Sequence, residues 1–383
     1  MINKAILQDL INFRKILHTY PELSGQEEKT AQKIIDQLKL THPSQIIEQL
    51  GGHGIAAIYD SGKIGKTVLF RADTDALPIQ EVNNFAYKSV YNGISHKCGH
   101  DGHSTILVGL AQKIADQPLK KGKVILLFQP AEEIGKGAKA VLEDKKFSAL
   151  QPDYVFALHN VPSYPKGQIV CRKGTFNPAV ISLVIKMKGK KAHAAQPEDG
   201  INPDIAIATL ISKIHQLTNN DATSDGFFKI TTIYTRIGSK DYGISAGEGE
   251  LHYTLRCKTK EKLEETKQTL IELIETICKQ ERLTFSLEWI YYFAASVNDG
   301  FAVDCIRKVA EKHHFSYHEK TVPFNWGEDF GLFTEHFTGA MFGLGAGEST
   351  PALHQDDYDF PDEIIPYGIE MFYGIAEEIM NIS

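Results

Sequence analysis

Cysteine is scarce in this 383-residue sequence, and the few residues present are widely separated. There are five, an odd number without the Cys-x-x-Cys spacing of a structural zinc site. Scattered cysteines are typical of reduced thiols in the cytosol and do not fit the disulfide framework of a secreted protein. We therefore expect a cytoplasmic protein. The five residues are Cys98, Cys171, Cys257, Cys278 and Cys305.

Long apolar runs and an excess of positive charge are also missing. No apolar run approaches the length needed to cross a bilayer. Residues 1–17 alternate charged and apolar side chains at helical spacing, without the apolar core of a signal peptide. The net charge is −7, from 41 Lys and Arg against 48 Asp and Glu. These features argue against a membrane or nucleic-acid partner.

The first part of the chain alternates helical and strand patterns. Its length exceeds that of one ordinary core, so two domains are expected. The spacing predicts helices over 4–18, 27–39 and about 104–116, and strands over 55–59, 67–71, 123–129 and 154–158. This alternation predicts an α/β fold with a largely parallel central sheet flanked by helices, with ligands at the carboxyl ends of its strands.

A second pattern begins after about Phe176. Strands are predicted over 180–188, 228–237, 251–257 and 283–290, with helices over 203–217 and 261–280. The order βαββαβ is that of a ferredoxin-like α+β domain. We expect this domain, residues 178–290, to be inserted into a catalytic domain formed by residues 1–177 and 291–383. Two crossings between the domains would provide two hinges, so the inserted domain would serve as a lid.

The segment Ser95–His103 holds a thiol and several imidazoles within a few positions. Glycines on either side of His100 predict a bent loop, not a smooth helix. Thiolate and imidazole suit zinc and its divalent neighbours. Cys98 and His100 are two positions apart, so both would face one ion if the segment is extended. The alternative is a buried cysteine beside a surface histidine.

Other polar residues follow the predicted strands. Glu132 and Glu133 come after an apolar strand, where one carboxylate would bind a metal and the other would accept a proton. The alternative is a solvated acidic turn. His159 and His354 are isolated, and either alone is more often structural than a ligand. Asp73 would orient a ligand imidazole or cap a turn.

Together these segments resemble the M20 family of metallo-aminoacylases and peptidases. The resemblance is strongest to the amidohydrolase branch that includes hippurate hydrolases, N-acetyl-diaminopimelate deacetylases and auxin-conjugate hydrolases. The matching motifs run in family order across nearly the whole chain: Arg71–Pro78 (RADTDALP), Cys98–His103 (CGHDGH), Phe128–Glu133 (FQPAEE), Leu158–Pro162 (LHNVP), Gly189–Ala195 (GKKAHAA), Glu328–Phe330 (EDF) and Leu353–His354.

The resemblance implies a role for each matching position. Five residues match the metal ligands: Cys98, His100, Glu133, His159 and His354. Five ligands exceed the needs of one catalytic zinc, so the resemblance implies one or two divalent ions (Zn, Mn, Co or Ni), with Cys98 as the bridge between a pair. Glu132 matches the general base, and Asp73 matches the carboxylate that supports a metal-bound imidazole.

Two further matches lie in the predicted insertion. His193 matches a histidine that stabilises the tetrahedral oxyanion, often from the partner subunit of a dimer; the alternative is an ordinary strand-end histidine. Arg256 matches an arginine that binds a substrate carboxylate. A homodimer through the inserted domain is expected from the resemblance.

The chain departs from the wider family at three places. Arg71 stands where most members have a metal-binding His, and Cys98 stands where they have a bridging Asp. The amidohydrolase branch shares both changes. Gly243-Ile244-Ser245-Ala246 occupies the place of an Asn-x-x-Pro motif upstream of Arg256, which leaves the substrate preference open.

The expected activity is metal-dependent hydrolysis of the amide bond of N-acyl amino acids. N-acetyl-diaminopimelate deacetylase, metallo-dipeptidase and carboxypeptidase activities are the alternatives, followed by a non-catalytic small-molecule-binding relative. The sequence does not specify the acyl group, the amino acid or the native metal.

Overall fold

The computed structural model describes residues 3–381, which divide into two compact units. The first unit contains the chain up to Phe176, then Ser296–Thr321, and the chain from Glu328 onward. The second contains Asn177–Ala295 and Val322–Gly327. The short segment 322–327 packs with the second unit, so the chain passes between the units four times, at 176/177, 295/296, 321/322 and 327/328. The sequence predicts only two passages.

The first unit is built on an eight-stranded mixed sheet. Its central strands β4, β3, β5 and β16 are parallel, whereas β1 and β2 continue it in antiparallel fashion on one side and β6 is antiparallel to β16 on the other. The α/β class is confirmed, with antiparallel strands outside the parallel centre. In sheet order the strands are β1 (Gln45–Leu50), β2 (Gly54–Asp60), β4 (Lys123–Gln129), β3 (Thr67–Asp73), β5 (Tyr154–Pro162), β16 (Thr338–Gly347), β6 (Ile169–Cys171) and β15 (Tyr317–Glu319).

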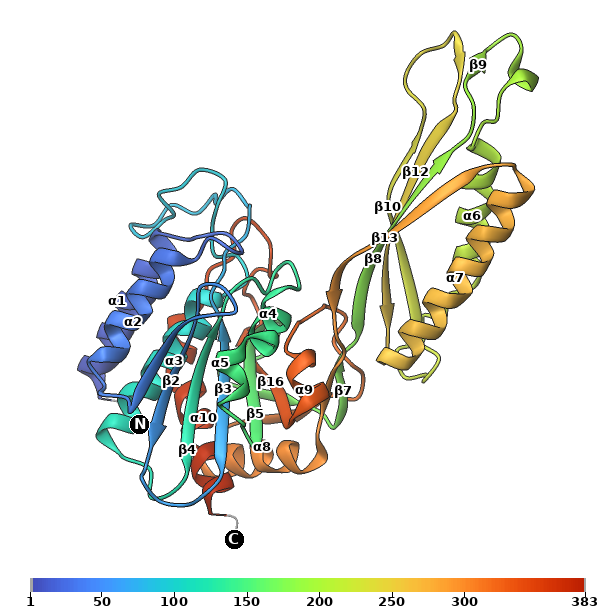
Figure 1. Ribbon diagram of the computed structural model, residues 1–383. Coiled ribbons are helices and arrows are strands. Elements are labelled where there is room, and N and C mark those ends of the chain that lie inside the picture. The colour runs from blue at the N-terminus through green and yellow to red at the C-terminus, as the bar shows by residue number, and fades with distance from the viewer. Residues whose placement is uncertain (1–2, 382–383) are drawn as a thin grey trace. The chain divides into compact units, whose positions relative to one another are not determined.

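Helices cover both faces of this sheet (Figure 1). The larger hydrophobic core lies on one face, beneath α1 (Lys4–Thr19), α2 (Glu28–Lys39), α3 (His100–Asp116), α8 (Gly300–Lys312) and α10 (Ile365–Met380). The shorter helices α4 (Gly137–Glu143), α5 (Lys145–Ser148) and α9 (Gly331–His336) pack on the other face. Central strands covered on both sides carry long apolar runs, as in β4, where Val124–Phe128 are all apolar and buried.

The second unit is a four-stranded antiparallel sheet with two helices on one face. Its elements are β8 (Ala179–Lys188), α6 (Asp204–Gln216), β10 (Phe228–Ile237), β12 (Glu248–Cys257), α7 (Lys260–Gln280) and β13 (Thr284–Phe293). The spatial order β10-β12-β8-β13 is that of the predicted ferredoxin-like βαββαβ unit. Smaller elements complete the two units: β7 (Gly174–Asn177), β9 (Ala192–His193), η1 (Pro197–Asp199), β11 (Ile244–Ser245), β14 (Ser296–Asn298) and η2 (Asp362–Ile364).

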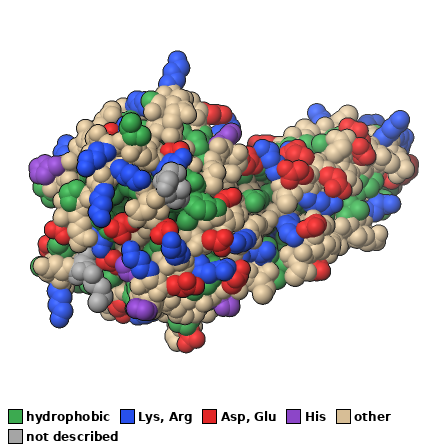
Figure 2. All heavy atoms as spheres, turned by 90° about the horizontal axis from the view of Figure 1, so that it is seen from below, with side chains coloured by type: hydrophobic (Ala, Val, Ile, Leu, Met, Phe, Trp, Pro, Cys, Tyr) green, Lys and Arg blue, Asp and Glu red, His purple; other side chains and the backbone are tan. Residues whose placement is uncertain are grey.

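The surface carries charges of both signs. On the face shown in Figure 2, lysines and arginines are interspersed with acidic side chains and do not form one basic field. No helix within residues 3–381 combines the length and the hydropathy that a membrane span requires.

Two buried cationic side chains fasten α1 to the start of α3. Arg14 Nη1 donates to Asp101 Oδ2 at 3.0 Å, and His18 Nδ1 donates to the same oxygen at 2.8 Å. The other ring nitrogen of His18 donates to Glu81 Oε1 at 3.0 Å. Burial alone would lower the pKa of His18, but its hydrogen bonds to Asp101 and Glu81 raise the pKa to about 9.

This raised pKa predicts how stability depends on pH. Folded His18 keeps its proton up to about pH 9, whereas an unfolded histidine loses it near 6.5. Its contribution is therefore complete below pH 6.5 and disappears as the pH rises through 9, a change of about 3 kcal/mol. Urea unfolding of chelator-treated protein should show the advantage of wild type over His18→Gln shrinking across this window. His336→Gln, at an exposed position, should track wild type; a constant difference between wild type and His18→Gln would contradict the assignment.

Candidate metal centre

The polar residues identified in the sequence gather at the carboxyl ends of the central parallel strands. Asp73 ends β3 and Gln129 ends β4, while His159 and Asn160 lie near the end of β5. Helix α3 begins beside them with His100, and the loop after β16 carries His354. This is the edge of the sheet at which α/β proteins bind ligands.

The turn at Gly99 brings Cys98 and His100 to one side. Gly99 has φ = +96° and precedes α3, whose first residue is His100. The predicted bend is found at Gly99, but His100 lies in a helix and not in a loop, and the predicted extended spacing of Cys98 and His100 is wrong. The left-handed turn at Gly99, and not an extended segment, brings the side chains of Cys98 and His100 to the same side. A Cβ atom at position 99 would lie 2.4 Å from Oδ1 of Asn160, so only glycine fits.

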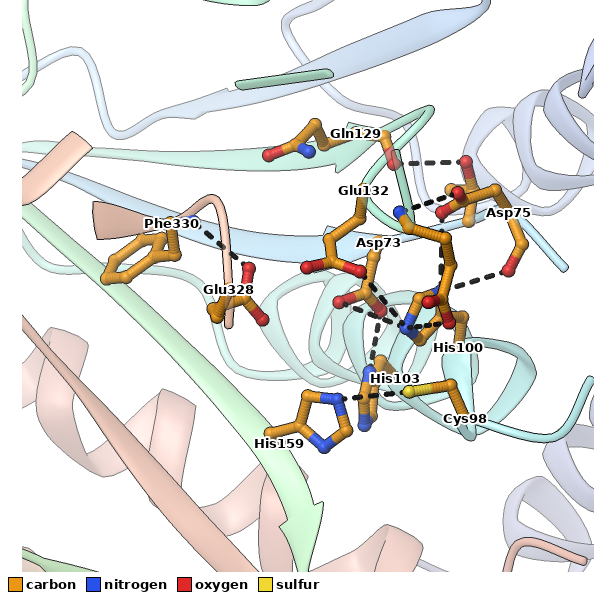
Figure 3. Close-up of polar contacts among 12 residues, drawn as sticks. Asp73, Asp75, Cys98, His100, His103, Gln129, Glu132, His159, Glu328 and Phe330 are labelled. Atoms are coloured by element: carbon orange, nitrogen blue, oxygen red, sulfur yellow. Dashed lines mark hydrogen bonds and ion pairs between the residues drawn. The ribbon is translucent and has the colours of Figure 1, made fainter. Parts of the chain in front are cut away.

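All five expected ligands converge on this site. Their side chains form two overlapping groups, and within each group the donor atoms lie within 4.8 Å of one another. Cys98 belongs to both. In the first group its Sγ lies 3.5 Å from Nε2 of His159 (Figure 3), and in the second Nε2 of His354 lies 3.6 Å from Oε2 of Glu133. The groups are Cys98, His100 and His159, and Cys98, Glu133 and His354.

Neighbouring groups orient these donors. Nδ1 of His100 lies 2.9 Å from the main-chain oxygen of Asp75, which turns Nε2 toward the acidic side chains. Nδ1 of His159 lies 2.9 Å from the main-chain oxygen of Asn160. Within residues 3–381, the buried atoms His100 Nε2 and Glu133 Oε1 have no hydrogen-bond partner. Buried polar atoms are rarely left so, and a mixed S, N and O donor set suits a zinc-like ion.

Asp73 and Asp75, two aspartates of the same motif, face different ring nitrogens of the expected ligand His100. Asp73 places Oδ1 2.6 Å from Nδ1 of His103 and accepts from Arg71 Nη1 at 2.7 Å, while its distance to Nε2 of His100 is 3.7 Å. Asp75 lies directly beside Nδ1 of His100, and its Oδ2 accepts the main-chain N–H of Glu133 at 3.0 Å. Sequence reasoning missed Asp75, although it lies in the same motif.

Arg71 is fully buried against two carboxylates that the sequence analysis left without a role. Its Nη2 lies 2.7 Å from Asp329 Oδ1 and 2.9 Å from Glu328 Oε1, and its Nε donates to Gln129 Oε1 at 3.0 Å. A guanidinium is a permanent cation and offers no metal-ligand atom. At this position it neutralises acidic neighbours. In the sequence, the two adjacent acids of the EDF motif were the signal that could have indicated partners for Arg71.

The turn before the two adjacent glutamates points them in different directions. Ala131 has φ = +54°, and its N–H donates to the buried Glu27 Oε1 at 2.8 Å. Glu133 then faces the second donor group, whereas the Glu132 carboxylate lies within 4.8 Å of those of Glu328 and Asp329 and 4.0 Å from Nε2 of His100. The two carboxylates therefore occupy different environments.

Burial and mutual repulsion perturb these acids strongly. Burial, with the charges of Glu328 and Glu133, raises the pKa of Glu132 well above its usual range. Burial also raises the pKa of Glu133 to about 7 and that of the Cys98 thiol well above its usual range. A divalent cation among these groups would offset the repulsion and favour their ionised forms.

Two expected site residues lie in the second unit. His193 is exposed on β9, and its Nδ1 accepts the N–H of Ala195 at 3.0 Å. Arg256 is half-buried on β12 and donates from Nε to the main-chain oxygen of Asn325 at 2.9 Å. The segment that replaces Asn-x-x-Pro pairs with the strand of His193, since the N–H of Ala194 donates to the oxygen of Gly243 at 2.9 Å.

Residues 69–378 match the family described as Peptidase family M20/M25/M40. The chain belongs to this family. It is 30% identical to an N-acetyldiaminopimelate deacetylase of Lactobacillus acidophilus, over 98% of either chain. It is also 29% identical to an N-acetylcysteine deacetylase of Bacillus subtilis, over 100% of this chain and 99% of the relative.

Solved structures agree with this assignment. The Bacillus subtilis YXEP protein, described as a dinuclear metal-binding peptidase of family M20, has a TM-score of 0.86, 26% identity and full coverage of both chains. The aminopeptidase PepT of Bacillus cereus, at 17% identity, shares the fold with a TM-score of 0.74 over 97% of this chain and 98% of its own.

The shared position of Cys98 in both donor groups predicts the effect of removing its thiol. Cys98→Ala should weaken metal binding at least ~100-fold, because both groups lose a donor. Equilibrium dialysis followed by elemental analysis measures this. Cys305→Ala removes an equally buried thiol from α8 and should retain the metal. Equal metal content in the two variants would rule out Cys98 as a ligand.

Proposed function

We propose that this protein is a metal-dependent hydrolase that cleaves the amide bond of N-acyl amino acids. The observation that carries the proposal is the pair of donor groups sharing Cys98, with the Glu132 carboxylate beside them. One or two divalent ions, of zinc, manganese, cobalt or nickel, would be held by these groups. A bound ion would act as a Lewis acid on the scissile carbonyl and would make water more acidic.

Glu132 is the general base of the proposed reaction. Its carboxylate is buried beside other acids, which makes it a strong proton acceptor in water-poor surroundings. It takes a proton from the attacking water and passes it to the leaving amine. Glu133, turned away by the preceding backbone, remains a metal ligand. Asp73 and Arg71 form an ion pair in the surroundings of the base, and Asp75 orients His100.

The second unit supplies substrate recognition in this proposal. Arg256 binds the carboxylate of the amino-acid part, and His193 stabilises the oxyanion of the tetrahedral intermediate. Support for Arg256 comes from its surroundings: burial lowers the pKa of its guanidinium, and within residues 3–381 no carboxylate forms an ion pair with it. We also propose a homodimer through this unit and closure of the unit over the substrate, on the family resemblance.

The relatives favour a short acyl group. Two of them are named for removing acetyl from diaminopimelate and from cysteine, so acetylated amino acids are the first substrates to assay. Peptidase activity is the second candidate, because one structural neighbour at 26% identity is described as a peptidase. A panel of N-acyl amino acids and dipeptides separates these activities. The cytoplasmic location is part of the proposal and is based on the cysteine pattern.

Replacing the base should separate chemistry from metal binding. Glu132→Gln preserves shape but cannot accept the proton, so kcat should fall about 10²- to 10⁴-fold. Metal content should stay at the wild-type value, because Glu133 and the other donors are unchanged. Turnover of N-acetyl amino acids and elemental analysis give the two quantities. Glu143→Gln, on the surface of α4, serves as the control, and near-normal turnover by Glu132→Gln would remove its role as base.

The proposed role of Arg256 predicts a dependence on the substrate carboxylate. Arg256→Gln should lower kcat/KM for an N-acyl amino acid about 10- to 100-fold, the effect of losing one charged hydrogen bond. The corresponding N-acyl amino acid amide should be affected little. Arg236→Gln on β10 is the matched control, because Arg236 already pairs with Glu248 and Glu250. Equal losses on both substrates would contradict a carboxylate contact.

A further inference from the structure

We propose that Lys97 is a positioning residue that sets the separation of the Cys98 and His354 segments and thereby the affinity of the second donor group for metal. The inference rests on the metal centre of the proposed function and concerns a residue outside the ligand set. Lys97 precedes Cys98 in the sequence, and its side chain is fully buried. All the contacts used below lie within the first unit.

The ammonium group of Lys97 uses all of its donors. Nζ lies 2.7 Å from Glu81 Oε1, 2.7 Å from Asn83 Oδ1 and 2.8 Å from the main-chain oxygen of Tyr358. An ammonium group has three N–H donors, so each contact is matched by one hydrogen. The contact with Tyr358 reaches the segment that carries His354, four residues earlier in the chain.

The main chain of Lys97 makes a second connection to the same segment. Its carbonyl oxygen accepts the N–H of His354 at 2.8 Å. His354 has φ = +68°, a conformation that is uncommon for a non-glycine residue. The His354 segment is therefore joined to Lys97 at two points, through its main chain at His354 and through the oxygen of Tyr358.

Tyr358 extends this connection toward the first donor group. Its ring is fully buried, and its hydroxyl accepts from Nδ2 of Asn160 at 2.5 Å. Asn160 follows His159 and supplies the main-chain oxygen beside Nδ1 of that histidine. One lysine thus links the strand of His159, the segment of Cys98 and the segment of His354.

Stability alone is a weak reason for such a residue. A buried ion pair contributes little net stability compared with apolar side chains of similar volume, because both charges must lose water. Glu81, the carboxylate partner, already pairs with His18. What an apolar side chain at position 97 could not supply is the hydrogen bond that fixes Tyr358, and with it the position of His354 relative to Cys98.

The test compares Lys97→Met with Lys113→Met. Lys113 is the control, because it also pairs with a buried carboxylate, that of Glu370, between α3 and α10, and this pair lies away from the expected metal ligands. Apo protein is titrated with Zn²⁺ against a competing chelator. Spectra of the Co²⁺-loaded protein then report the ligand geometry at Cys98, which a general loss of stability would not change.

Lys97→Met should keep one tight Zn²⁺ site and bind the second ion about 10- to 100-fold more weakly, with an altered Co²⁺ spectrum. Lys113→Met should match wild type in both measurements. Wild-type affinities and an unchanged spectrum in Lys97→Met would overturn the proposal. Absence of metal binding by the wild-type protein would instead overturn the proposed function, and this inference with it.

Asn83→Ala provides a milder variant in case Lys97→Met does not fold. Asn83 is half-buried, accepts one Lys97 donor and donates to the oxygen of Asp357 in the same His354 segment. Its removal should weaken the second Zn²⁺ site by a smaller factor and leave the first unchanged. Unchanged affinity for both ions in folded Asn83→Ala would overturn the proposed link.

Discussion

Repulsion among buried acids is the constraint on which the architecture of the site depends. Carboxylates from the ends of β3 and β4 and from the EDF motif lie within a few ångströms of one another, with little water to screen them. Arg71 compensates part of this charge through Asp73, Glu328 and Asp329. The remaining acids face His100 and Cys98, where a divalent cation would complete the compensation.

The residues that hold this arrangement lie outside the site. Helix α1 contributes none of the expected metal ligands, yet hydrogen bonds from Arg14 and His18 fasten it to Asp101, the neighbour of His100. Glu81 connects His18 to Lys97, which in turn contacts the His354 segment. The start of α3 is therefore held from one side by the N-terminal helix and from the other by the loop after β16. The side chains expected to bind metal are distant in sequence, and they converge because this buried layer of charge positions the segments that carry them.

The sequence predicted much of this structure wherever a signal was local. Strands such as β4 and helices such as α7 follow from apolar runs and periodicity, and the five expected ligands were found by motif. Strand β16 was not predicted, because its glycines reduce strand propensity. The reason for them is tertiary: a Cβ at Gly339 would lie 2.0 Å from the oxygen of Val155 on the neighbouring strand. The helical position of His100 and the support from Asp75 depend on one left-handed turn and one main-chain contact, and residue spacing encodes neither.

The guanidinium of Arg71 changes what the neighbouring acids can do. A guanidinium stays protonated under all relevant conditions, so it compensates charge without competing for metal. Glu328 and Asp329 are paired with it directly, whereas Glu132 makes no ion pair with Arg71 among the contacts within residues 3–381. Glu132 therefore lies between two sets of groups. On one side are the acids Glu328 and Asp329, which pair with the permanent cation Arg71. On the other side are the side chains expected to bind an exchangeable metal cation. Burial, together with repulsion from Glu328 on one side and Glu133 on the other, raises the affinity of this carboxylate for a proton. That is the property a general base needs, and it follows from the burial of Glu132 and from the charges placed around it.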